Sequence, residues 1–111
     1  MNGVTKPYRF YPDSSNSYIT IPIDMRQSLG WQNGDSIHIL IKTDASSVGL
    51  FLYKNNGGET TNYFFRKERS KSRITIPKSV AKSLDWKDKD TIYIEPREFD
   101  GHQGLFLQKL E

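Results

Sequence analysis

The chain of 111 residues contains no cysteine, and it contains only two histidines, which fall in no ligand-spaced cluster. A disulfide framework, thiolate metal sites and thiol catalysis are therefore excluded. No stretch is apolar for long enough to span a membrane, and the first ten residues lack the apolar core of a signal peptide. We expect one folded domain over residues 1–111, without cofactor, metal or membrane association, in a reducing cytoplasm.

The net charge is small, but positive charge is concentrated in one place. The formal net charge is +3, which by itself says little about partners. The run Arg66–Arg73 nevertheless holds five positive charges and one negative. Such a local patch creates a strong field even when the total charge is small.

The chain resembles itself when it is shifted by 55 residues. Ser17–Pro22 then falls on Ser72–Pro77, and Gly49–Leu52 falls on Gly104–Leu107. Over Tyr8–Lys54 against Tyr63–Lys109, 19 of 47 positions are identical without a gap. This self-similarity indicates an internal duplication, with a first repeat at about 7–54, a linker at 55–60 and a second repeat at about 62–110.

Each repeat predicts short strands around one short helix. Tyr18–Ile21 and Arg73–Ile76 read as β-branched strands that end at a proline, whose fixed φ suits a helix start. Met25 and Leu29 share one helix face, as Val80 and Leu84 do in the second repeat. Gly30 is the expected C-terminal cap of the first helix, whereas Asp85 at the matching position suits a positive φ less well.

One repeat is too small to bury its apolar face alone, so we expect two copies to share one core. The predicted fold is mostly β with two short helices and internal pseudo-two-fold symmetry.

The phrase Arg73–Leu84 followed by Trp86 resembles the signature of the AbrB/SpoVT/MazE family, and Ile19–Pro22 with Leu29–Trp31 repeats it in the first half. The resemblance implies a swapped-hairpin β-barrel, formed here by two tandem repeats of one chain. It also implies a prokaryotic-type DNA-binding transcriptional regulator, associated with the nucleoid, or an antitoxin. Members of the family grip duplex DNA with basic residues of the first hairpin and the helix start.

Carried over residue by residue, the resemblance assigns DNA contacts unevenly. The family's arginine before the strand is Arg73 in the second repeat but Tyr18 in the first. Arg66 matches a basic residue of the preceding strand, where the first repeat has Tyr11 with Arg9 nearby. The predicted contacts, all from the hairpins and helices, are Arg66, Lys67, Arg69, Lys71, Arg73, Lys78, Lys82, Arg9, Arg26 and Tyr18. We therefore expect asymmetric DNA binding, in which the second repeat supplies most of the contacts.

Each candidate also has a purely structural interpretation. The basic run is on its own more typical of a solvated turn, and the family resemblance tips it toward DNA. Trp31 and Trp86 fit core packing better than base stacking because their place repeats. Tyr18 is equally consistent with a phosphate contact and with a surface β-former. Asp35 and Asp90 fit turn capping better than acid–base work, so no residues support an enzyme.

Three functions remain in competition. The first is the DNA-binding regulator, acting as a monomeric pseudo-dimer or as a homodimer that exchanges halves. The second is an antitoxin that binds a toxin, which is expected less because the last strand runs to the end of the chain and leaves no tail. The third is a protein-interaction module, which the missing arginines of the first repeat favour. The sequence does not specify the target site, the regulated genes or the sign of regulation.

Overall fold

A computed structural model of the chain describes residues 3–10, 16–32, 35–44, 47–54, 62–68 and 71–110. For residues 7, 9, 10, 16, 44, 62–68 and 71–72, it describes the backbone only. Eight strands and two short helices follow one another in these ranges: β1 (Val4–Phe10), β2 (Asn16–Ile21), α1 (Ile23–Leu29), β3 (Ser36–Asp44), β4 (Ser47–Lys54), β5 (Asn62–Glu68), β6 (Lys71–Pro77), α2 (Lys78–Ser83), β7 (Thr91–Phe99) and β8 (His102–Lys109). The prediction of a mostly β fold with two short helices is confirmed.

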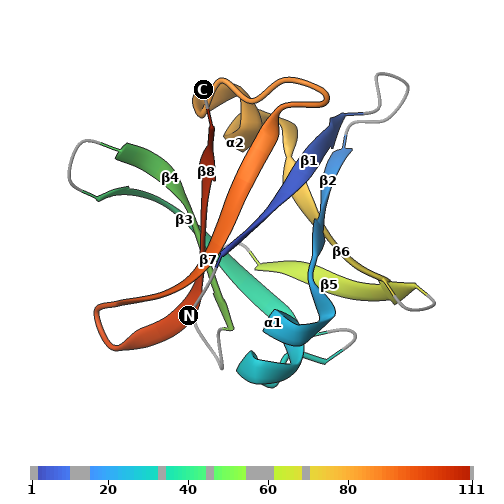
Figure 1. Cartoon of the computed structure of the whole chain (residues 1–111), viewed down its shortest axis with the longest axis vertical. Coiled ribbons are helices and arrows are strands. Elements are labelled where there is room, and N and C mark those ends of the chain that lie inside the picture. Colours follow the sequence, from blue (N-terminus) through green and yellow to red (C-terminus); the bar gives the residue numbers. More distant parts are fainter. Residues whose placement is uncertain are drawn as a thin grey trace.

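The strands pair in a closed cycle, in the order β1-β2-β6-β5-β3-β4-β8-β7, with β7 returning to β1. All of these pairs are antiparallel. Pairs of strands from the two halves of the chain alternate in the cycle, because β2 pairs with β6, β5 with β3, β4 with β8 and β7 with β1. Figure 1 shows β1, β2, β5 and β6 on one side, with the ends of β3–β4 and β7–β8 projecting on the other. The two helices lie at opposite ends of this arrangement.

The pairing registers are two-fold symmetric. Ile19 lies opposite Ile74, and Phe51 lies opposite Phe106, so each of these pairs joins positions 55 residues apart. The first hairpins differ from the ungapped alignment, because Tyr8 lies opposite Ile19 while Phe65, not Tyr63, lies opposite Ile74. The counterpart of Tyr8 is therefore Phe65. From Phe65 to Ile74 the chain is two residues shorter than from Tyr8 to Ile19, so an alignment with a two-residue gap between these positions agrees with the pairing.

Proline and an αL residue bound each helix. Pro22 and Pro77 precede α1 and α2 with φ of -58° and -61°, which continues an extended strand directly into a helix. Gly30 ends α1 with φ 71°, as predicted. Its N–H donates to the Gln27 carbonyl, and the Trp31 N–H donates to the Arg26 carbonyl, which is a Schellman motif.

The end of α2 repeats this geometry with a less suitable residue. The Asp85 N–H donates to the Lys82 carbonyl, and the Trp86 N–H donates to the Ala81 carbonyl. Asp85 therefore adopts φ 58°, the left-handed conformation in which a residue with a Cβ is strained. The second helix end thus keeps the hydrogen bonds of the first at a conformational cost.

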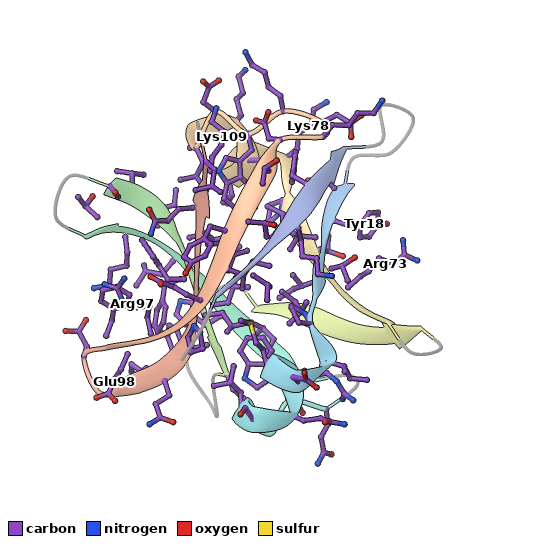
Figure 2. All side chains as sticks on the ribbon, viewed as in Figure 1. Tyr18, Arg73, Lys78, Arg97, Glu98 and Lys109 are labelled. Carbon is purple, nitrogen blue, oxygen red and sulfur yellow. The ribbon has the colours of Figure 1, made fainter. Side chains whose placement is uncertain are left out.

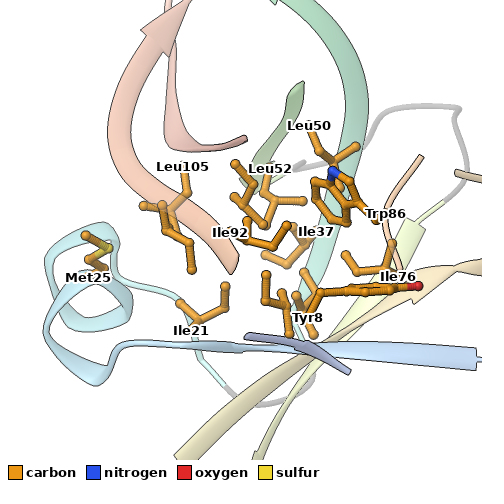
Figure 3. Packing of buried hydrophobic residues seen from close by; sticks show 14 of the residues in the cluster. Tyr8, Ile21, Met25, Ile37, Leu50, Leu52, Ile76, Trp86, Ile92 and Leu105 are labelled. Carbon is orange, nitrogen blue, oxygen red and sulfur yellow. The ribbon is translucent and has the colours of Figure 1, made fainter. Parts of the chain in front are cut away.

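The core lies inside the cycle of strands (Figure 3). Every second side chain of a strand points inward, as the two-residue period of a β-strand requires. Trp31 and Trp86, which follow α1 and α2, pack against this core. Trp31 and Trp86 are 2% and 6% exposed, so their prediction as core residues is confirmed. The buried Tyr8 hydroxyl donates to Ser17 Oγ at 2.6 Å, and Ser17 Oγ donates to the Ile76 carbonyl at 2.9 Å.

Strands β4 and β8 cross at two glycines. A Cβ on Gly104 would overlap the Leu52 carbonyl, and a Cβ on Gly49 would overlap the Leu107 carbonyl. Only glycine allows the two backbones to approach so closely. Phe51 and Phe106 are buried, but they lie on the outer side of this crossing, where Phe99 packs edge-on against both rings.

Two aspartates hold the turns after the helices. Asp35 Oδ2 accepts from the Gln32 N–H, and Asp90 Oδ2 accepts from the Lys87 N–H, both at 2.7 Å. Their prediction as turn caps is confirmed. Neither of the two helices in the described ranges is long and apolar enough to cross a membrane.

Candidate nucleic-acid interface

The outer face of the four-stranded sheet β1-β2-β6-β5 carries two of the residues predicted to contact DNA, Tyr18 and Arg73. In β2 and β6 the residues alternate between the core and this face. Ile19, Ile21, Ile74 and Ile76 point inward and are buried, whereas Tyr18, Thr20, Arg73 and Thr75 are half-exposed on the other side. The register places Tyr18 opposite Thr75 and Thr20 opposite Arg73. The β-branched alternation of the sequence thus produces a polar face around the symmetric Ile19–Ile74 pair.

Tyr18 and Arg73 occupy equivalent positions on either side of this pair. Figure 2 shows the two side chains together at the outer edge of the molecule. The Arg73 guanidinium carbon lies 5.3 Å from the centre of the Tyr18 ring, within the range of a cation–π contact. A symmetric face would carry an arginine at both positions. Here only Arg73 is an arginine, and its guanidinium contacts the ring of Tyr18, which occupies the second position.

The flanking strands β1 and β5 place two further arginines directly opposite Tyr18 and Arg73. Arg9 lies opposite Tyr18, and Arg66 lies opposite Arg73. Arg9 is therefore the counterpart of Arg66, which corrects the expectation that Tyr11 holds that place. Tyr11 lies outside the described residues, and for Arg9 and Arg66 only the backbone is described.

The rest of the basic run is at the end of the β5–β6 hairpin. Lys67 lies opposite Ser72, and Glu68 lies opposite Lys71. The side chains of Lys67 and Lys71 are not described, and Arg69 lies outside the described residues. The backbone thus places Lys67 and Lys71 on the same hairpin as Arg73.

Helix α2 adds two exposed lysines next to the sheet. Lys78 and Lys82 are one helical turn apart and line a groove of about 410 Å³ with Trp86 and Lys87. Lys78 directly follows Pro77, which lies opposite Asn16 at the end of the β2–β6 pairing. Lys78 thus continues the chain of β6 beyond the end of the β2–β6 pairing.

The structure places Arg26 apart from the other residues predicted to contact DNA. Its side chain is 8% exposed, and its Nη1 donates to the Trp31 carbonyl at 3.1 Å. The guanidinium thus donates a hydrogen bond to a carbonyl that follows the C-terminal end of α1, where backbone carbonyls lack intrahelical partners. The sequence held a signal for this, because the equivalent residue of α2 is Ala81, a small apolar residue typical of an inward face.

Among the residues that the structure describes, no group of three or more histidines, cysteines and acids is arranged to hold a metal ion. His38 and His102, which are not equivalent in the repeat, stack on the same ring of Tyr53 with centroids 4.8 and 4.4 Å away. Tyr53 Oη and His38 Nδ1 share a hydrogen bond of 3.0 Å. Burial, and next the neighbouring His102, lower the pKa of His38 below its ordinary value of 6.5. No pattern in the sequence indicated this cluster, which joins β3, β4 and β8.

Residues 66–105, from β5 to β8, match the family model described as antidote-toxin recognition MazE, bacterial antitoxin. This part of the chain is thus similar to a family that is described by toxin recognition. No curated protein and no solved structure gave a significant match.

Proposed function

We propose that the chain is a non-enzymatic DNA-binding regulator that holds duplex DNA against the outer face of β1-β2-β6-β5. The observation that carries the proposal is the position of Arg73. It is half-exposed at the centre of a polar sheet face, and the register brings Arg66 and Arg9 into the same rows. Such a protein acts in the cytoplasm, on the nucleoid.

The physical basis is the charge of the duplex backbone. Lysine and arginine side chains that replace condensed counterions gain free energy from the release of those ions. On this face and its hairpin, the sequence provides Arg9, Arg66, Lys67, Arg69, Lys71 and Arg73, and α2 adds Lys78 and Lys82. Arginine also recognises guanine through two parallel hydrogen bonds, and strands enter the major groove in known β-sheet readers.

The proposed architecture is the swapped-hairpin barrel of the AbrB/MazE type, closed within one chain of 1–111. Repeat one at about 7–54 and repeat two at about 62–110 each contribute strands to both sides of the other. The alternation of the two halves around the strand cycle and the two-fold registers support this interpretation.

The face is two-fold symmetric in backbone but not in side chains. Tyr18 stands at the position equivalent to Arg73, and the Arg73 guanidinium leans on its ring. The half of the face centred on Arg73 and Arg66 therefore supplies more cationic groups than the half centred on Tyr18 and Arg9. We infer that the preferred DNA site is not a palindrome.

The second candidate function is that of an antitoxin, because the matched family model is described by toxin recognition. In that case the chain binds a toxin protein, and DNA binding is a secondary property. A stable complex with a toxin encoded beside this chain, together with negligible DNA binding at physiological salt, would favour this candidate.

The test is DNA binding across a salt series for wild type, Arg73→Ala and Arg97→Gln. Arg97 is a matched control, because it is also a half-exposed arginine of a strand, but on the opposite side of the molecule (Figure 2). We expect Arg73→Ala to weaken binding roughly tenfold and to reduce the salt slope by about 1, as for one lost phosphate contact. Arg97→Gln is expected to bind as wild type. Equal affinities of wild type and Arg73→Ala would contradict the proposal.

A further inference from the structure

A buried arginine of the first half has an alanine as its counterpart in the second half. Arg26 is 8% exposed, and its Nη1 donates to the Trp31 carbonyl at 3.1 Å. The equivalent residue of α2 is Ala81, whose side chain ends at Cβ and has no donor for the Trp86 carbonyl. The groove of about 410 Å³ that Ala81 and Trp86 line, the α2 groove, thus lies where the first half holds the arginine side chain.

The floor of the α2 groove is apolar and fixed in shape. Tyr8, Ala81 and Trp86 line it and are buried, and the rings of Tyr8 and Trp86 pack edge-on with centroids 5.5 Å apart (Figure 3). The Trp86 N–H also donates to the Ala81 carbonyl at 3.0 Å, which holds these two residues together. The volume is in the range of small-ligand pockets, so one small apolar group fits without rearrangement of the core.

The charged residues on the rim of the α2 groove are Lys78, Lys82, Asp85, Lys87 and Asp88. Asp85 pairs with Lys109 at 3.6 Å, and Lys78 and Asp88 each have contacts of their own. Lys82 and Lys87 are exposed, and within the described ranges neither side chain forms an ion pair. The charge that this rim leaves without an internal counter-charge is therefore positive.

The two halves place positive charge differently around the equivalent sites. The counterparts of Lys82 and Lys87 are Gln27 and Gln32, so the first half has a cation inside and neutral amides at these two rim positions. The second half has an alanine inside and a lysine at each of the two rim positions. An apolar group thus finds room inside the α2 groove, and an anionic end finds two ammonium groups at its rim.

We propose that the α2 groove binds a small organic anion. Its apolar ring or chain lies against Ala81 and Trp86, and its anionic group lies near Lys82 and Lys87. Charge complementarity selects an anion, and the size of the site selects a small molecule, because a single arginine side chain occupies the equivalent place in the first half. Exposed lysines are screened by solvent and salt, so we expect a dissociation constant of about 1 mM.

Ligand binding in this groove does not depend on the proposed DNA binding, but one consequence of it does. Lys82 is one of the predicted DNA contacts, so an anion beside it competes with a phosphate of the duplex. If the chain is the proposed regulator, we expect a saturating ligand to weaken its binding to duplex DNA. Ligand binding itself is measured without DNA, so the failure of one proposal is distinguishable from the failure of the other.

The test is an amide NMR titration of the whole chain with hydrocinnamate (a phenyl ring on a short carboxylate chain), with its uncharged amide and with inorganic phosphate. We expect hydrocinnamate to shift the resonances of Ala81, Lys82 and Lys87 saturably, while those of Arg26 and Gln32 stay in place. The amide lacks the charge and phosphate lacks the apolar body, so both are expected to bind at least roughly tenfold more weakly. Equal shifts from phosphate, or no saturable shift from hydrocinnamate at about 20 mM, overturn the proposal.

Two arginine variants separate filling of the groove from charge. Ala81→Arg gives the second half the residue that the first half already accepts, so the fold is expected to tolerate it. This variant adds positive charge but fills the groove, and we expect binding to weaken at least roughly tenfold. Ser79→Arg, the matched control, adds the same charge at an exposed position of α2 outside the groove and is expected to bind as wild type does. Equal or tighter binding by Ala81→Arg overturns the proposal, because surface charge alone then accounts for it.

A double variant keeps the proposal testable should Ala81→Arg not fold. Lys82→Gln with Lys87→Gln gives the rim the two residues of the first half. We expect the affinity for hydrocinnamate to fall roughly tenfold, to that of the uncharged amide, with an unchanged circular dichroism spectrum. An unchanged affinity overturns the proposal, since the anion is then held elsewhere.

Discussion

The two halves of the molecule are alike inside and different outside. Trp31 and Trp86 both close the core, Asp35 and Asp90 both cap a turn, and the strand crossing uses a glycine from each half. On the surface, by contrast, Tyr18 stands for Arg73 and Ile41 for Pro96. One symmetric core imposes the same demands on both halves. A single chain that encodes both halves separately allows each outer face to change without its counterpart, which two identical subunits cannot do.

The largest expected effect comes from the strand crossing. Gly104→Ala places a methyl group on the Leu52 carbonyl, which belongs to backbone and cannot move aside as a side chain does. We expect a loss of roughly 3 kcal/mol in the free energy of unfolding, as for severe overpacking. Gly101→Ala is the control, since no atom lies within 4 Å of its added Cβ and only the strain of alanine at φ 83° is expected to cost about 1 kcal/mol. Urea unfolding measures both, and an equal loss for the two variants would refute the role of the crossing.

Restoring symmetry on the proposed DNA face is the next effect. Tyr18→Arg adds a second cationic group beside Arg73 and removes the ring on which Arg73 leans. Given a phosphate or guanine contact by the new arginine, we expect affinity for a palindromic duplex to rise roughly tenfold. Tyr18→Phe keeps the ring and tests the hydroxyl alone. Selection of preferred sequences by each variant measures the change, and an unchanged, still asymmetric preference for Tyr18→Arg would count against the inferred half-site.

The helix ends provide a pair of opposite effects. Gly30 has φ 71° and Asp85 has φ 58° at equivalent positions. Gly30→Ala is expected to destabilise by about 1 kcal/mol, because alanine is strained at that φ and no contact changes. Asp85→Gly is expected to stabilise by roughly 0.5 kcal/mol through relief of the same strain. Thermal unfolding of both variants checks the two signs, and a stabilising Gly30→Ala would contradict the assignment.

The smallest expected effect is the pH dependence of His38. Its folded pKa is lowered below 6.5, so between the two pKa values the unfolded chain binds more protons than the folded one. The stability contributed by neutral His38 is complete above the unfolded pKa and is lost as the pH falls below about 6.5 through the folded pKa. Urea unfolding at several pH values measures this loss. His38→Gln is expected to make the dependence shallower, and an unchanged slope would assign the loss to other groups.

The internal periodicity predicted much of this fold, because most of the residues that repeat are residues that pack in the core. Each Ile-x-Ile-Pro phrase alternates inward isoleucines, stops at proline and starts a helix, so local chemistry alone placed these elements. The register of the first hairpin could not be predicted from the sequence. The hairpin of the second half is two residues shorter between Phe65 and Ile74 than its counterpart between Tyr8 and Ile19, and no local pattern indicates a gap there.

The candidate site was predicted in part for the same reason. Arg73 follows from strand alternation, and Lys78 and Lys82 from the helix start. Arg26 was misplaced because a seven-residue helix offers too few turns to distinguish an inward arginine from an outward one. The stack of His38, Tyr53 and His102 joins β3, β4 and β8 across a strand crossing that only the tertiary structure defines.

The most direct test of the central claim is an amide NMR titration of the whole chain with a duplex at physiological salt. The account predicts that the resonances of Tyr18–Thr20, Arg73–Thr75 and Lys78 shift or broaden together, while those of Glu95–Phe106 stay in place. Perturbations centred on β3, β4, β7 and β8 instead, or none at a large excess of duplex, would contradict it.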